Sequence, residues 1–423
     1  MADVNRFGTR RGFLGNSTTA LALVAGRAVP LQAANTREHA ADQGVDYYEK
    51  LGVTKVINAA GTYTFLTASI MPPSVQAAVA QAAKHPVRLN ELQKAAGEYL
   101  AKRLQCEAAL VTAGAASALT LGTAACMTVS NPSAVKQMPI DMSGLKNEVI
   151  VQKAHRYDYD HALVNCGIRF VEVETVDEYQ KAFTDKTVMA HFFNAAEEGN
   201  ISREDWIRVA HQHGIPCFND AAADVPPISN LWNYTKMGFD LVTFSGGKGI
   251  RGPQNAGLLL GRKDLIAAAV ANDMPISDTI GRGMKVAKEQ IVGMVAAVDW
   301  FLEQSDEGME AEFRRRANNI SDRLKDIPTM RAKIVIPEVA NHVPHLLLNY
   351  DENRVKISAR DVAEELRRGN PSIELNPATG SENSRGLTSE PNTIVVGVWM
   401  LQPGEDAIVA RRLHEVLSRA ASA

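Results

Sequence analysis

One stretch decides the fold of this 423-residue chain: DLVTFSGGKGIRGPQ, residues 240–254. Its first part is an apolar run typical of a buried strand, and the glycine-rich turn that follows carries Lys248. A strand that ends in such a turn places the lysine at the carboxyl edge of a sheet, where α/β proteins bind their ligands. Glycines on both sides of the lysine leave room for a bulky planar ligand against the backbone. Taken alone, the stretch also suits a lysine in an ordinary surface loop.

A carboxylate follows a second strand-like run. Residues 215–219 lead into Asp220, which lies 28 residues before Lys248. A lysine at a sheet edge has one well-known use, a Schiff base to pyridoxal phosphate. Chemistry on that cofactor needs a carboxylate against the pyridine nitrogen, because a protonated ring accepts electrons from the substrate. We therefore expect Lys248 and Asp220 to be the catalytic pair.

Two other segments suit the rest of the cofactor. Gly114, Ala115 and Ala116 follow a predicted strand and begin a predicted helix, so their free backbone N–H groups can hold a phosphate. Ser245 can add a further hydrogen bond to that phosphate. His155 also follows a predicted strand, and its ring can stack on the cofactor. The alternatives are tight helix packing at the glycine and a polar surface role for the histidine.

The pattern around these motifs is that of a large parallel sheet. The chain alternates apolar runs with helical patterns, which predicts helices on both faces of the sheet. We expect a large cofactor-binding domain over 37–299, with an N-terminal arm at 37–60, and a smaller α+β domain over 300–423. The predicted strands of the large domain are 109–112, 148–152, 169–173, 188–193, 216–219, 241–245 and 257–261.

The first 36 residues have the layout of an export signal. Arg10 and Arg11 precede a short, mildly apolar stretch and a small-residue end. The stretch is too short and too rich in Gly, Ser and Thr to span a bilayer. The segment looks like a twin-arginine signal, which predicts a periplasmic protein. The alternative is a disordered tail with a chance arginine pair, which would leave the protein in the cytoplasm.

Composition narrows the partners. The chain has 45 basic and 48 acidic residues, a net charge of -3, so no overall positive field attracts nucleic acid. Hydrophobic residues make up 45%, as in ordinary folded proteins, and no membrane span is expected. The four cysteines are widely spaced, so we expect buried thiols and no metal site.

The order of these motifs resembles that of fold-type I pyridoxal-phosphate enzymes with an aminotransferase-like fold. The finer resemblance is to the selenocysteine synthase-like group, which includes L-seryl-tRNA selenium transferases and D-glucosaminate-6-phosphate ammonia-lyases. The motifs that carry it are VINAAGT (56–62), YDYDHAL (157–163), FSGGK (244–248), GPQ (252–254), IGRGMKV (280–286) and LQPGE (401–405).

The resemblance implies roles for the residues named above. Lys248 would be the Schiff-base lysine, Asp220 the pyridinium partner and His155 the stacking residue, with Gly114, Ala115, Ala116 and Ser245 around the phosphate. Lys285 is a rival lysine, but it opens a long predicted helix instead of ending a strand. The resemblance also implies a homodimer or higher symmetric oligomer, in which Arg282 reaches a phosphate or a carboxylate, including one in the neighbouring subunit. The candidates for binding the substrate carboxylate are Arg251, Arg282, Arg367 and Arg385.

The expected function is pyridoxal-phosphate chemistry at the α-carbon of an amino acid or a related small amine. A lyase comes first, by elimination, ammonia loss or aldol cleavage. A racemase or epimerase and an aminotransferase are the alternatives. Selenium transfer to tRNA is disfavoured by the charge, by the expected export and by the little chain before Val56. A binding protein without catalysis is disfavoured because Lys248, Asp220 and the phosphate turn are all intact.

Overall fold

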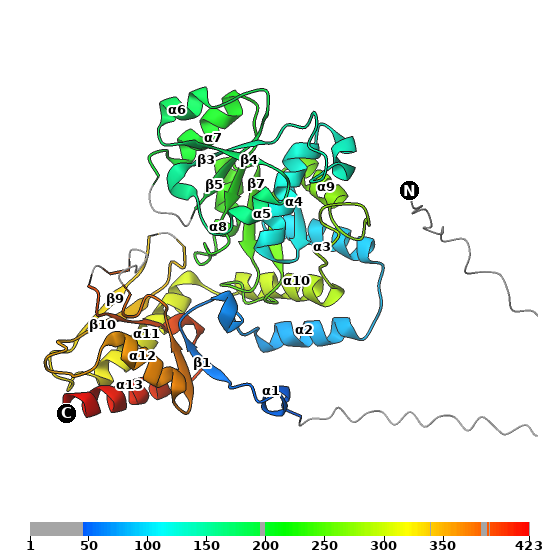
Figure 1. Ribbon diagram of the computed structural model, residues 1–423. Helices are drawn as coiled ribbons and strands as arrows, with labels where there is room; N and C mark the ends of the chain where they lie inside the picture. Colours follow the sequence, from blue (N-terminus) through cyan, green and yellow to red (C-terminus); the bar gives the residue numbers. More distant parts are fainter. Residues whose placement is uncertain (1–44, 195–198, 339, 382–386, 389, 423) are drawn as a thin grey trace, which may run out of the picture. The chain divides into compact units, whose positions relative to one another are not determined.

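The computed structural model covers most of the chain (Figure 1). The residues that it describes are 45–194, 199–338, 340–381, 387–388 and 390–422. The twin-arginine segment expected within residues 1–36 and the candidate Arg385 lie outside them. Residues 45–54 belong to one compact unit and contain a single short helix within the described part, α1 (Tyr47–Lys50). The chain from Lys55 onward forms the second unit.

A seven-stranded sheet with the order β2-β8-β7-β6-β5-β3-β4 forms the centre of the second unit. Among the described strands of this sheet, β8 alone runs opposite to the other six, so the carboxyl ends of those six meet at one edge. This confirms the mostly parallel α/β sheet, and each predicted strand lies within one residue of an observed one. The strands are β2 (Ala108–Thr112), β3 (Glu148–Gln152), β4 (Arg169–Val173), β5 (Thr187–Phe193), β6 (Cys217–Asp220), β7 (Leu241–Ser245) and β8 (Gly257–Gly261).

Both faces of this sheet are buried under apolar clusters. Successive side chains of a strand point to opposite faces, so each strand contributes to both clusters. In β8, Leu258 and Leu260 belong to one apolar cluster and Leu259 to another. Helices cover each face, as the sequence predicts. The cluster of Leu259 includes residues of α4 (Gly114–Thr128), α5 (Asp160–Val164) and α9 (Lys263–Asn272). The other cluster includes residues of α2 (Pro73–Ala83), α3 (Leu89–Arg103), α6 (Val176–Lys181), α7 (Arg203–Gln212), α8 (Asn230–Met237) and α10 (Lys288–Leu302).

The C-terminal elements form a separate apolar cluster around smaller sheets. A three-stranded antiparallel sheet has the order β12-β10-β9, and a parallel pair joins β1 (Val56–Ala59) to β11 (Ser372–Leu375). The sequence did not predict β1 or β11, and their pairing places residues near the N-terminus among C-terminal elements (Figure 1). The domain boundary near residue 300 stays a prediction. The other elements are α11 (Asp306–Arg323), β9 (Arg331–Val335), β10 (His345–Asn349), α12 (Ala359–Arg368), β12 (Ile394–Gly397) and α13 (Glu405–Ala421).

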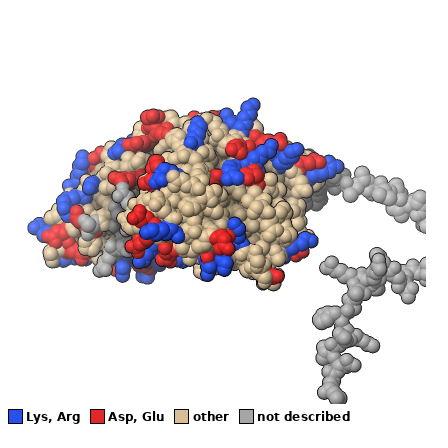
Figure 2. Space-filling model, turned by 90° about the horizontal axis from the view of Figure 1, so that it is seen from above, with Lys and Arg blue, Asp and Glu red and all other residues tan. Residues whose placement is uncertain are grey.

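The charge distribution on the surface and the state of the cysteines are those expected from the composition. On the face drawn in Figure 2, basic and acidic side chains are interspersed. All four cysteines are free thiols, of which Cys106 is half-buried and the other three are buried. Within the described residues, no helix has the length and apolar character that a membrane crossing needs.

Candidate active site

The turn after β7 is built so that Lys248 can leave the sheet edge. A Cβ atom on Gly246 would lie 2.7 Å from the carbonyl oxygen of Ala256, and one on Gly247 would lie 2.7 Å from Cα of Gln254. Only glycine therefore fits at these two positions. Burial lowers the pKa of the Lys248 amine, while the carboxylates of Asp220 and Asp224 act in the opposite direction. The turn thus holds an amine that loses its proton more easily than an exposed lysine.

Asp220 ends the neighbouring strand, β6, and is 4% exposed. Its Oδ2 accepts a hydrogen bond from the Tyr157 hydroxyl at 2.5 Å, and its Oδ1 accepts one from the backbone N–H of Ala222 at 3.0 Å. Burial raises the pKa of the Asp220 carboxyl, while these hydrogen bonds and the charge of Lys248 oppose the rise. Each carboxylate oxygen has two lone pairs, so Asp220 retains capacity for a further donor.

Tyr157 is the residue of this site that the sequence analysis did not single out. Its ring stacks on Phe193 of β5, with 3.9 Å between the ring centroids. Burial and the neighbouring Asp220 raise the pKa of its hydroxyl, so the group is a donor at neutral pH. The available signal was its position only two residues after His155, within the YDYDHAL motif.

His155 makes its ring and Nδ1 contacts with β5. Its ring meets the edge of the Phe192 ring at 4.5 Å, and its Nδ1 accepts the backbone N–H of Phe193 at 3.3 Å. Phe192 and Phe193 are consecutive in β5, so they point to opposite faces of the sheet. His155 packs beside the first ring and Tyr157 on the second. The aromatic ring next to Asp220 is therefore that of Tyr157. Burial, reinforced by the charge of Arg203, lowers the pKa of His155 to about 4.

The start of α4 reaches the same edge. Gly114 begins the helix with a φ of +86°, and Ala113 before it supplies no side-chain cap to the first N–H groups, which include those of Ala115 and Ala116. Gly257 of β8 pairs with Thr112 on one side and with Ser245 on the other. This pairing places Ser245 and the uncapped helix start on either side of one glycine.

The arginine candidates differ in their surroundings. Arg251 has a left-handed backbone, with a φ of +57°, and its Nη2 donates to the carbonyl oxygen of Trp399 at 2.7 Å. Burial and the nearby Arg316 lower the pKa of Arg251 to about 10. Among the described residues, no carboxylate forms an ion pair with it. Arg282 and the rival Lys285 are exposed, and Arg367 forms an exposed pair with Glu364 at 3.1 Å.

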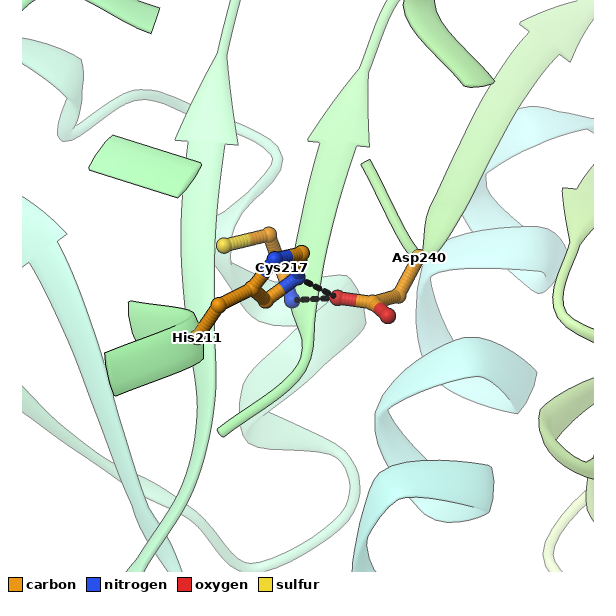
Figure 3. Close-up of side chains that lie close together, drawn as sticks. All are labelled: His211, Cys217 and Asp240. Atoms are coloured by element: carbon orange, nitrogen blue, oxygen red, sulfur yellow. Dashed lines mark hydrogen bonds and ion pairs between the residues drawn. The ribbon is translucent and has the colours of Figure 1, made fainter. Parts of the chain in front are cut away.

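A second polar cluster lies at the opposite edge of the sheet (Figure 3). His211, Cys217 and Asp240 offer three potential metal ligands within 4.8 Å of one another. However, Asp240 already accepts hydrogen bonds from the backbone N–H of Cys217 at 2.7 Å and from His211 Nε2 at 2.8 Å, and it pairs with Arg262 at 3.1 Å. Burial raises the pKa of the Cys217 thiol, which disfavours the thiolate that a metal needs. We interpret the cluster as a structural contact between β6, β7 and two helices.

The arrangement at the carboxyl edge defines a class of protein. A lysine on the turn after one strand, a carboxylate ending the next strand and an uncapped helix start at the same edge are the elements of a fold-type I pyridoxal-phosphate enzyme. The groups present suit that cofactor, because they are a half-buried amine of lowered pKa, a buried carboxylate with spare lone pairs and helical N–H groups without a side-chain cap.

Comparison with known proteins gives the family. The model for "Aminotransferase class-V" matches residues 168–368. D-glucosaminate-6-phosphate ammonia lyase of Salmonella typhimurium is 29% identical and matches 88% of this chain and 98% of its own length. A 5'-C-glycyluridine monooxygenase-decarboxylase of Streptomyces is 30% identical and matches 88% of this chain and 92% of its own length. A solved structure of D-glucosaminate-6-phosphate ammonia-lyase superposes with a TM-score of 0.77 at 27% identity, covering 89% of this chain and 99% of that one.

The chain belongs to the class-V aminotransferase family and is a pyridoxal-phosphate-dependent enzyme. This confirms the cofactor and the fold that the sequence predicted. The roles of the individual site residues stay predictions.

Proposed function

We propose that this enzyme is a lyase that breaks a bond at the α-carbon of an amino-acid-like substrate. The observation that carries the proposal is the placement of Lys248 and Asp220 at one sheet edge, on the turn after β7 and at the end of β6. The similarity to D-glucosaminate-6-phosphate ammonia lyase over most of both chains favours lyase chemistry over racemisation and transamination. Selenium transfer to tRNA is disfavoured because the net charge of -3 provides no field for a polyanion.

The residues that would hold the cofactor come from several strands. Lys248 would bind its carbonyl carbon, Asp220 would accept the pyridine N–H, and Ser245 and the start of α4 at Gly114, Ala115 and Ala116 would hold its phosphate. Bound in this way, pyridoxal phosphate supplies an electron-accepting ring for the negative charge that develops when a bond at the α-carbon breaks.

The chain's own groups then control proton transfer and orientation. Lys248 takes a proton from the substrate α-carbon or returns one to it, and burial favours the neutral amine that this task needs. The hydrogen bonds from Tyr157 and the backbone N–H of Ala222 favour the ionised form of Asp220, against the effect of burial. Tyr157 thus orients Asp220, while His155 stays the candidate for stacking on the cofactor ring.

Arg251 is the best of the arginine candidates for the substrate carboxylate. It lies three residues after Lys248, is half-buried and has no ion-pair partner among the described residues. A partly desolvated guanidinium without a carboxylate is costly, and an incoming carboxylate with two parallel hydrogen bonds would offset this cost. Arg282 remains the candidate that serves a neighbouring subunit of a homodimer.

Product analysis with the purified full-length protein tests the function. D- and L-amino acids, small amines and amino sugar acids, including D-glucosaminate 6-phosphate, are supplied, and products are identified by mass spectrometry. Release of ammonia or of a cleaved carbon fragment supports the lyase. A product of inverted configuration would indicate an isomerase, and transfer of the amino group to a keto acid an aminotransferase.

The Lys248→Ala variant tests the site, with Lys285→Ala as the matched control. We expect Lys248→Ala to lose the cofactor absorbance band and to lower turnover by about 10²- to 10⁴-fold, the range for a missing general acid–base. Lys285→Ala should keep both, because Lys285 is exposed. A Lys248→Ala protein that retains the yellow chromophore would rule out this site.

Export and assembly complete the proposal. The Arg10-Arg11 motif and the short apolar stretch after it support export to the periplasm by the twin-arginine route. That route carries folded proteins, so the cofactor could be inserted before export. Cell fractionation that finds the protein only in the cytosol, with Met1 or Ala2 at its N-terminus, would exclude export. A monomer by light scattering would exclude the homodimer.

A further inference from the structure

A second buried carboxyl lies in the loop that follows β6. Asp224 comes four residues after Asp220 and is 3% exposed. Its Oδ2 accepts hydrogen bonds from Asn194 Nδ2 and, at 3.4 Å, from the Tyr234 hydroxyl. Its Oδ1 is buried and has no hydrogen-bond partner among the residues that the structure describes. A buried carboxylate oxygen without a donor is costly, so this oxygen calls for a physical explanation.

The loop that carries Asp224 packs directly on the lysine turn. A Cβ atom on Gly249 would lie 2.0 Å from the carbonyl oxygen of Val225. Gly249 follows Lys248 and Val225 follows Asp224, so the two backbones are in contact beside both residues. The backbone N–H of Ser245 also donates to the carbonyl oxygen of Ala222 at 3.2 Å. The lysine turn is therefore flanked by a loop with one carboxyl at each end.

The hydrogen bonds around Asp224 fix its orientation. Arg203 Nε donates to Asn194 Oδ1 at 2.5 Å, so the Asn194 amide must direct its NH₂ group away from Arg203. That NH₂ group donates to Asp224 and, at 2.7 Å, to the Tyr234 oxygen. Oδ2 is held by this network and Oδ1 is left open. The titratable and charged groups that interact with Asp224 are Asp220 on β6, Lys248 after β7, Arg203 on α7 and Tyr234 on α8.

The pKa values of Asp224 and Lys248 shift toward each other. Burial and the charge of Asp220 raise the pKa of Asp224 to about 7, with Asn194, Lys248 and Arg203 acting against the rise. Burial lowers the pKa of Lys248 from its usual value. A proton can move between a carboxyl and an amine with little loss of free energy when their pKa values are close.

We propose, on the basis of the function proposed above, that Asp224 is a positioning residue and the proton partner of Lys248. When Lys248 is an ammonium, one of its N–H bonds breaks and an O–H bond forms at Oδ1 of Asp224, leaving a neutral amine and a neutral carboxyl. The reverse transfer restores the ammonium. The exchange moves one proton and no electron pair leaves either residue. Asp220 is thereby free to remain ionised toward the cofactor.

The first experiment follows the Lys248 amine in the full-length chain freed of cofactor. Competitive labelling with acetic anhydride across pH, read by mass spectrometry, gives the reactivity of this lysine alone. In the native chain we expect a second inflection near pH 7, where Asp224 titrates. Asp224→Asn should remove that inflection and lower the pKa of Lys248, because a nearby negative charge is lost. Because this measurement needs neither cofactor nor substrate, it remains decisive if the proposed function fails.

The matched control is Asp273→Asn. Asp273 is 2% exposed and burial raises its pKa to about 7, but it ends α9 and does not belong to the site. Its variant should leave the Lys248 profile unchanged. In the holoenzyme, Asp224→Asn should lower kcat by about 10- to 100-fold with little change in KM, at the weaker end of acid–base effects. Asp224→Glu, which restores a carboxyl, should recover part of the loss.

Two results would overturn the proton pairing. One is a Lys248 profile that is the same in the native chain, Asp224→Asn and Asp273→Asn. The second result applies even if the Asp224→Asn protein does not fold. It is a Lys248 profile that has a single inflection in the native chain and is the same in Asp224→Glu. If the pairing is present but no cofactor band forms on Lys248, the proposed function fails and the proton partnership stands.

Discussion

The two ends of strand β6 carry polar clusters that differ in how completely their groups are paired. At the start of the strand, both oxygens of Asp240 are occupied, by His211, by the backbone N–H of Cys217 and by Arg262 (Figure 3). At the end of the strand, Asp220 shares its surroundings with the half-buried amine of Lys248, and the second carboxyl, Asp224, has one oxygen without a donor among the described residues.

This difference separates a structural cluster from a working one. Where every donor meets an acceptor, the cluster stabilises the fold and its groups have little reason to exchange protons. Where opposite charges are desolvated and hydrogen-bonding capacity is left over, the groups are prepared for a ligand and for proton transfer. The amino and carboxyl edges of one sheet thus serve stability and chemistry respectively.

Among the variants that keep Lys248, Asp220→Asn should have the largest effect. The substitution removes the negative charge opposite the pyridine nitrogen but keeps the shape of the side chain. Turnover should fall by about 10²- to 10³-fold, as for the loss of a preorganised electrostatic contact. The cofactor band should persist, because Lys248 is intact. Steady-state kinetics and absorbance check this, and full activity in Asp220→Asn would place the pyridine nitrogen elsewhere.

Arg251→Gln should weaken the binding of the substrate. The net value of a hydrogen bond to a charged group is about 1.5–3 kcal/mol, so KM for the substrate should rise by about 10- to 100-fold. Because the contact is made before and during the reaction, kcat should change much less. Arg282→Gln is the comparison. A larger rise in KM for that variant would indicate that Arg282, and not Arg251, binds the substrate carboxylate.

Tyr157→Phe should have a smaller effect that depends on pH. The Tyr157 hydroxyl holds the pKa of Asp220 down, so its loss raises that pKa. Asp220 must be ionised, so the acid limb of the kcat/KM profile should move to higher pH, and activity should be lost earlier as pH falls. At the optimum we expect a loss of only about 2- to 10-fold, because the backbone N–H of Ala222 still donates to Asp220. Tyr159→Phe, at an exposed neighbour, should leave the profile in place.

The sequence predicted those features that single segments determine. Each long strand of the large sheet has its own apolar run, and parallel strands bring their carboxyl ends together, so Lys248 and Asp220 followed from local patterns. The contact between Tyr157 and Asp220 depends on the face of β5 that each ring meets, which no local pattern encodes. The sequence therefore did not indicate Tyr157, and the stacking role of His155 stays a prediction. Similarly, β1 has four residues, and its pairing with β11 joins segments more than 300 residues apart.

Asp240→Asn should have the smallest effect on turnover. It tests the polar cluster at the start of β6, which we assign to stability. The amide keeps one acceptor but brings an NH₂ group toward the donors of His211 and Arg262, so the free energy of unfolding should fall by about 1–3 kcal/mol. Equilibrium denaturation measures this. Because the cluster lies at the amino edge, kcat should not change, and a chelator should affect neither stability nor activity if no metal is bound there. A drop in kcat at unchanged stability would show that the two ends of β6 are coupled, and the separation of stability from chemistry along this strand would fail.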